Sequence, residues 1–225
     1  MNPHYTYAAL HVGAFTFPFL LSFDKRVAFY RKWKFLFPAI ALVAAVFIIW
    51  DIYFTKWGVW SFNPDYITGI YIKNLPWEEV LFFFTIPYCC LFIYECVIAY
   101  FPRIDFPKTA RGITVTLAGI TLLVGALNMD KYYTSWSALG SFVLLVVMAV
   151  KNYSWMSKFW VSYVIVAIPF FICNGILTAK PVVLYNNDEN LAIRMYTIPV
   201  EDLMYNFIML AGVTILFEQF RKKSA

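Results

Sequence analysis

Two short acidic motifs contain the residues of this chain that are best suited to chemistry. Residues 76–79 read Pro-Trp-Glu-Glu and residues 199–202 read Pro-Val-Glu-Asp, and each motif opens a strongly apolar run. Carboxyl groups that crowd together away from water oppose one another's ionisation, so one of them can keep its proton near neutral pH. A neutral carboxylic acid can act as a general acid, and an ionised partner can take a proton back or stabilise a cation. The candidate catalytic residues are therefore Glu78, Glu79, Glu201 and Asp202.

The same acids also have a purely structural interpretation. A proline at the start of a helix fixes φ and gives up only an amide that had no partner. Acidic side chains in the first helical turn interact favourably with the helix dipole. Each pair taken alone is explained equally well in this way, whereas two matched pairs at one membrane depth favour a shared site.

The two motifs belong to an internal repeat. Glu78 and Glu201 are 123 positions apart, and the same offset aligns further identical residues on both sides of the motifs, such as Asn63 with Asn186. A duplicated unit that keeps its acids inside apolar segments indicates a site at the interface between the repeats.

The composition is typical of an integral membrane protein. The chain is 62% hydrophobic and 21% aromatic, and only 14% of its residues are charged, whereas soluble domains carry about 25% charged residues. We expect an all-α, polytopic fold of about seven transmembrane helices, each of about 20 residues. The expected spans are 4–22, 35–55, 76–98, 112–129, 133–150, 159–178 and 199–219.

The distribution of charge predicts how the chain crosses the membrane. Most of the 18 Lys and Arg residues fall after the first, third and fifth spans and at the C-terminus. The N-terminus is then expected outside and the C-terminus in the cytoplasm. These flanking residues also explain the net charge of +5 without a nucleic-acid surface, so no nucleic-acid partner is expected.

The repeat offset predicts the domain organisation. It carries the first three spans onto the last three and leaves the fourth span as a linker helix. Spans three and seven then cross in the same direction, so the two three-helix repeats are parallel. The expected division is 1–100 for the first repeat, 101–131 for the linker span and 132–225 for the second repeat.

Aromatic residues surround both acidic motifs. Most of them have an ordinary interpretation as an interfacial belt or as packing against lipid. A minority that faces the acids, with Trp77 and Phe82 as candidates, would stabilise a carbocation through the faces of the rings. An acid, an aromatic wall and the absence of water together describe a site that protonates an alkene.

Several other chemistries are disfavoured. The chain has no G-x-G-x-x-G motif for a nucleotide, and its two histidines both fall in the first span, too few for a di-iron or zinc site. The four cysteines lack the spacing of metal ligands. Residues 186–190 are the nearest approach to an acidic diphosphate-binding motif, but no cationic cluster accompanies them. We therefore expect neither a metal nor another cofactor.

The sequence resembles a known family over nearly its whole length. Residues 57–64, 69–70 and 75–83 in the first half, and 181–187 and 198–202 in the second half, are similar to the integral-membrane, flavin-independent lycopene cyclases. These occur as two small subunits or as one fused chain in bacteria, and joined to phytoene synthase in fungi. This chain resembles the fused bacterial form.

The resemblance implies a redox-neutral cyclisation of the open ψ ends of lycopene, with β-rings as the usual product. It also implies a bacterial inner-membrane location, a linear carotenoid taken from the bilayer and association with other carotenoid enzymes. The family's acidic motif corresponds to Glu78, Glu79, Glu201 and Asp202, of which Glu78 and Glu201 are the first acid–base candidates. The residues expected to hold these carboxyl groups are Asp51, Asn63, Asn174 and Asn186.

Two alternatives stay open from the sequence. A carotenoid end-group hydratase, or another carotenoid-modifying enzyme, would use a similar cation. A small transporter built from parallel repeats is the alternative from a different class, although polar residues here concentrate at the two ends of the spans rather than along a path between them.

Overall fold

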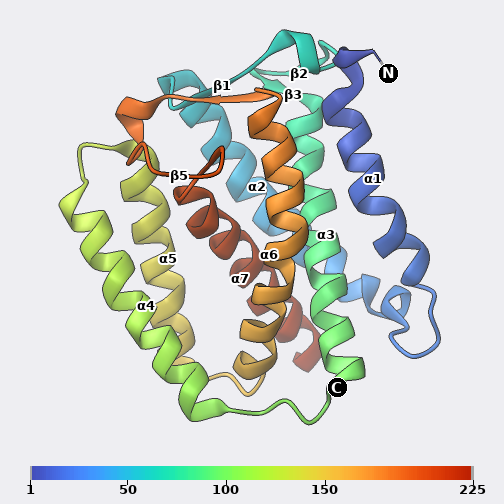
Figure 1. The fold of residues 1–225 in the computed structure, drawn as a ribbon. Helices are drawn as coiled ribbons and strands as arrows, with labels where there is room; N and C mark the ends of the chain where they lie inside the picture. Colours follow the sequence, from blue (N-terminus) through green and yellow to red (C-terminus); the bar gives the residue numbers. More distant parts are fainter. Residues whose placement is uncertain (1, 224–225) are drawn as a thin grey trace.

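The computed structural model describes residues 2–223, and this part of the chain forms seven α-helices with short strands between them (Figure 1). The helices are α1 (Thr6–Leu21), α2 (Trp33–Trp57), α3 (Trp77–Tyr100), α4 (Pro107–Leu127), α5 (Tyr132–Lys151), α6 (Met156–Ala179) and α7 (Glu201–Lys223). The strands are β1 (Trp60–Phe62), β2 (Tyr71–Ile72), β3 (Leu75–Pro76), β4 (Val183–Tyr185), β5 (Arg194–Met195) and β6 (Ile198–Pro199). The expected all-α, polytopic fold is confirmed.

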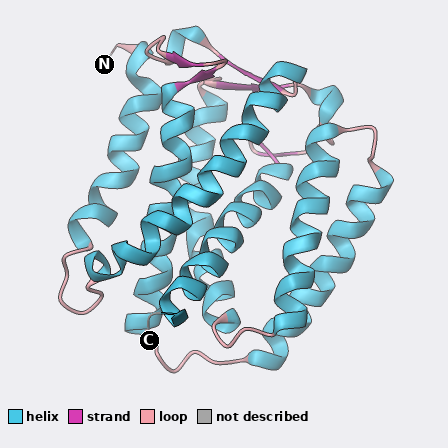
Figure 2. Cartoon of the chain, turned by 180° about the vertical axis from the view of Figure 1, so that it is seen from behind, coloured by secondary structure: helices cyan, strands magenta, loops and turns pink. Residues whose placement is uncertain are grey.

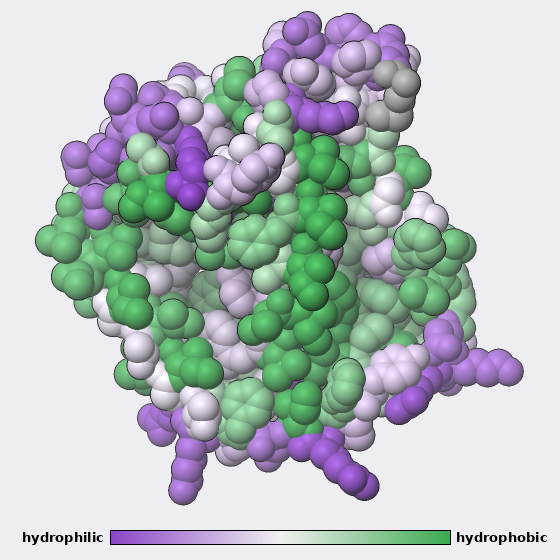
Figure 3. Space-filling model, in the orientation of Figure 1, coloured by the Kyte–Doolittle hydropathy of each residue, from purple (hydrophilic) through white to green (hydrophobic). Residues whose placement is uncertain are grey.

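Six of the described helical segments are long and apolar enough to cross a membrane, and they contain α2 to α7. The remaining helix, α1, has 16 residues, or about 24 Å, which is shorter than the expected seventh span. It still runs beside α3 along the bundle, and the chain termini lie at opposite ends of the molecule (Figure 1). Apolar residues form a belt around the visible face, with hydrophilic residues above and below it (Figure 3).

All the strands gather at the end of the bundle where α3 and α7 begin (Figure 2). β2 and β3 form one antiparallel hairpin before α3, and β5 and β6 form the equivalent hairpin before α7. Lys73 and Tyr196, which are related by the repeat offset, both take a positive φ in the hairpin turns. β1 pairs antiparallel with β4, so a strand from each half joins the two halves at this end.

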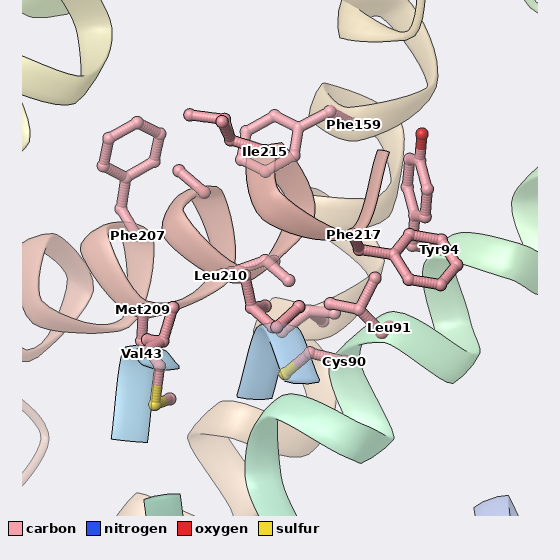
Figure 4. Packing of buried hydrophobic residues seen from close by; sticks show 14 of the residues in the cluster. Val43, Cys90, Leu91, Tyr94, Phe159, Phe207, Met209, Leu210, Ile215 and Phe217 are labelled. Atoms are coloured by element: carbon pink, nitrogen blue, oxygen red, sulfur yellow. The ribbon is translucent and has the colours of Figure 1, made fainter. Parts of the chain in front are cut away.

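Helices of the first half pack directly against helices of the second half. α2 packs against α7, and α3 packs against both α6 and α7. Figure 4 shows Met209 and Leu210 of α7 near Val43 of α2 and Cys90 and Leu91 of α3, all within one buried apolar cluster. This packing places the starts of α3 and α7, and hence both acidic motifs, in one region. Helix α4, which the sequence predicts as a linker between the repeats, pairs with α5 at the edge of the bundle.

Candidate active site

One carboxyl group from each acidic motif lines a single cavity. Glu79, from the first turn of α3, and Asp202, from the first turn of α7, both border a cavity of about 160 Å³. The two carboxyl groups are near enough to interact electrostatically. Most of the surrounding wall is apolar, and its aromatic members include Trp60, Phe82 and Tyr205. The repeats therefore build one common cavity rather than two separate ones.

Glu79 accepts a hydrogen bond from a tyrosine of the first helix. The Tyr7 hydroxyl of α1 donates to Glu79 Oε2 at 2.5 Å, and both side chains are buried. The ring of His11 stacks on Tyr7 at 5.0 Å between centroids, and its Nδ1 lies 2.9 Å from Thr85 Oγ1 on α3. These contacts fix the Tyr7 hydroxyl against the Glu79 carboxyl group.

Asp202 receives three donors. The Tyr133 hydroxyl of α5 donates to Oδ1 at 2.5 Å, while the Tyr185 hydroxyl and Asn174 Nδ2 each donate to Oδ2 at 3.1 Å. Burial, followed by the negative charge of Asp202, raises the pKa of Tyr185 well above its ordinary value. Tyr185 therefore stays a neutral donor. Because a carboxylate accepts but cannot donate, three donors aimed at Asp202 suit its ionised form.

A third buried carboxyl group belongs to Asp51, near the C-terminal end of α2. Trp60 Nε1 donates to Asp51 Oδ1 at 2.5 Å, and Asp51 interacts electrostatically with Glu79. Tyr205 of α7 interacts electrostatically with Asp51, Glu79 and Asp202. The phenol of Tyr205 thus lies among all three acids.

The first acid of each motif has different contacts from the second. Glu78 Oε1 accepts the backbone N–H of Thr68, and Glu201 Oε1 accepts that of Leu191, each at 2.8 Å. Thr134 Oγ1 also donates to Glu201. Neither Glu78 nor Glu201 lines the cavity. Consecutive helical residues point about 100° apart, so only one acid of each pair faces the cavity while the other anchors the preceding loop.

The remaining residues named from the sequence divide between the cavity and the loops. Phe82 and Asn174 line the cavity. Trp77 does not line the cavity, and its Nε1 donates to Thr68 Oγ1 at 2.6 Å. Asn63 and Asn186 each accept the backbone N–H two residues ahead at 3.0 Å, which fixes equivalent turns in the two repeats rather than the acids themselves.

Sequence reasoning missed the tyrosines that bind the two acids. Tyr7 and Tyr133 occupy equivalent places in α1 and α5, and each donates to the second acid of its own motif. They are 126 positions apart rather than 123, so an ungapped comparison of the halves does not align them. A comparison that permits an insertion of three residues would have found the pair.

The described residues contain no group of three or more His, Cys, Asp or Glu side chains that could hold a metal ion. The polar groups that line the cavity include carboxyl, phenol and amide groups. Such a set can donate and accept protons and stabilise positive charge.

The comparisons with known proteins point to one family. A family model described as lycopene cyclase matches residues 4–97 and 130–220. The chain belongs to the lycopene cyclase family. The two matched segments each contain one acidic motif, one cavity acid and its tyrosine, and α4 lies in the unmatched stretch between them. No curated protein and no solved structure matches the chain.

Proposed function

We propose that this chain is a lycopene β-cyclase, in which Glu79 and Asp202 are the catalytic acid and base. The observation that carries the proposal is that both carboxyl groups border one cavity with a largely apolar and aromatic wall. The sequence alone favoured Glu78 and Glu201, but these two hold backbone amides outside the cavity wall. We therefore assign them a structural role at the loops.

The first step is protonation of the substrate by Glu79. Its carboxylic acid gives a proton to the inner carbon of the terminal double bond of a ψ end, which leaves a tertiary cation on the outer carbon that bears the two methyl groups. Among the described residues, Glu79 accepts one hydrogen bond from a side chain, that of Tyr7. This leaves it better suited than Asp202 to carry a proton at rest.

Ring closure and proton loss follow. The next double bond attacks the tertiary cation and closes a six-membered ring, which moves the positive charge to a ring carbon. The ionised Asp202 then removes a proton from the ring carbon that bears the polyene chain, and the double bond of a β-ring forms. The aromatic side chains of the wall stabilise the passing cation through their π faces.

After ring formation, the two catalytic carboxyl groups are not yet in their starting protonation states. Glu79 has lost a proton and Asp202 has gained one, so the proton must return before the next turnover. Tyr185 interacts electrostatically with both acids and carries a hydroxyl that can donate and accept. It is our candidate for the relay. No atom is gained or lost by the substrate, and no oxidant or reductant is consumed.

We place the protein in a bacterial inner membrane with its N-terminus outside and its C-terminus in the cytoplasm. The basic residues of the loops after α1, α3 and α5 support this orientation. The site then lies toward the outer face. The division into a first repeat at 1–100, a linker at 101–131 and a second repeat at 132–225 stays part of the proposal, as does association with other carotenoid enzymes.

The test is expression of the chain in cells that accumulate lycopene, followed by chromatography of the extracted pigments. A cyclase gives carotenes with one or two β-rings. A hydroxylated acyclic product would identify a hydratase instead. Unchanged lycopene, with the protein shown to be in the membrane, would refute the proposed function.

A further inference from the structure

The cavity continues well beyond the two acids. Along α3 its wall runs from Glu79 to Ile93, which is about 21 Å of helix. α1 contributes Ala14 and Pro18 to this inner part, and α6 contributes Val166, Pro169 and Cys173. Below the acids, the cavity is therefore a groove between α1 and α6 whose floor is α3. We refer to it as the α1–α6 groove.

The size of the cavity requires an outlet for the substrate. A cavity of roughly 150 Å³ accommodates one benzene-sized ring, and the volume here is about 160 Å³. A volume of this size holds one end group of a long linear carotenoid but not its whole polyene chain. The chain must then extend along an apolar path that begins at Glu79 and Asp202.

The α1–α6 groove opens toward the lipid-facing side of the bundle. α1 and α6 contact each other near the strand end, where Tyr7 and Leu10 pack with Leu177, and they diverge with distance from that end (Figure 1). Pro169 is exposed, and Pro18 is half-exposed. No strand or loop covers this side of the bundle between α1 and α6 in Figure 1.

Two helix-interior prolines face the groove. Pro18 of α1 and Pro169 of α6 both border it. A proline inside a helix removes one backbone hydrogen bond and bends the helix. The carbonyl freed by Pro18 is that of Ala14, and it accepts a hydrogen bond from Cys89 Sγ of α3 at 3.5 Å. The carbonyl that Pro18 frees is therefore still paired at the groove.

We propose that the α1–α6 groove binds the linear polyene arm of the substrate and is the path by which an end group reaches Glu79 from the bilayer. This rests on the proposed function for the site. Its side walls, made by Ala14, Pro18, Val166, Pro169 and Cys173, carry no charge, which suits a hydrocarbon that enters sideways from lipid.

The experiment compares matched substitutions inside and outside the groove. Ala14→Phe and Cys173→Phe add a ring to opposite walls. Gly13→Phe and Ile172→Phe add the same ring at neighbouring positions outside the lining: a side chain at Gly13 meets nothing within 4 Å, and Ile172 is 59% exposed. Each full-length protein is purified in detergent with lycopene, and the pigment that co-elutes with it is measured by absorbance.

We expect the two groove variants to retain at least fivefold less lycopene than the wild type, and the two controls to stay within twofold of it. Equal retention by groove variants and controls would overturn the proposal. If a phenylalanine variant gives no monodisperse protein, Ala14→Leu and Cys173→Leu are measured in its place. The amount of bound pigment does not depend on turnover. A wild-type protein that binds lycopene without cyclising it would therefore refute the proposed function but not the proposal that the groove binds the polyene.

Discussion

Replacement of Glu79 by glutamine tests the assignment of the catalytic acid directly. The amide oxygen of glutamine can still accept the 2.5 Å hydrogen bond from Tyr7, so we expect the fold and the position of the side chain to be kept. The acidic proton is lost. General acid catalysis contributes typically about 10²–10⁴-fold to a rate, equivalent to about 3–5 kcal/mol of activation free energy. We expect the cyclisation rate to fall by that factor.

Glu78→Gln is the matched control on the same helical turn. Glu78 accepts a backbone N–H of the loop, and glutamine can still accept it. The change to an uncharged acceptor costs about 1 kcal/mol, or about fivefold in rate at most. The assay is the initial rate of cyclic carotene formation in isolated membranes, normalised to the amount of protein. Near-normal activity in Glu79→Gln together with an inactive Glu78→Gln would refute the assignment.

Three further predictions follow from the same geometry. Tyr133→Phe removes the hydroxyl that donates to Asp202 at 2.5 Å. Because a hydrogen bond to a charged group contributes about 1.5–3 kcal/mol, we expect the cyclisation rate in membranes to fall about tenfold or more. An unchanged rate would contradict the role of Asp202 as an ionised base. Because the repeats share one cavity, a one-ringed carotene should appear before any two-ringed product in a quenched time course, and two-ringed product without it would show that both ends react in one visit. Arg221→Ala removes the contacts of Arg221 with Glu95 and Glu218. We expect it to lower the free energy of unfolding by about 1.5–3 kcal/mol, measured by thermal unfolding in detergent, and to leave the cyclisation rate per folded molecule within twofold. A large loss of rate would contradict the assignment of Arg221 to stability alone.

The sequence predicted which types of residue form the site, but it did not predict which of their side chains contact the cavity acids. The two acidic motifs, and the expectation that they share one place, came from the repeat offset and the apolar runs. Asn174 was expected to hold a carboxyl group, and it donates to Asp202. Asn63 and Asn186 were expected to do the same, but they fix backbone turns. A short polar side chain can serve either purpose, and its local sequence does not distinguish the two.

The sequence by itself determined that the chain is a bundle of apolar helices and that carboxyl groups open two of them. Composition and span length suffice for this, because a lipid environment requires helices whose backbone is paired internally. The tertiary structure decided which carboxyl of each pair enters the cavity. That choice depends on the rotation of α3 and α7 about their axes, which is set by packing against α1, α5 and α6. It also brought Tyr7, Tyr133 and Tyr185 to the acids, because contacts between residues far apart in the chain are specified by the fit of whole helices rather than by any local pattern.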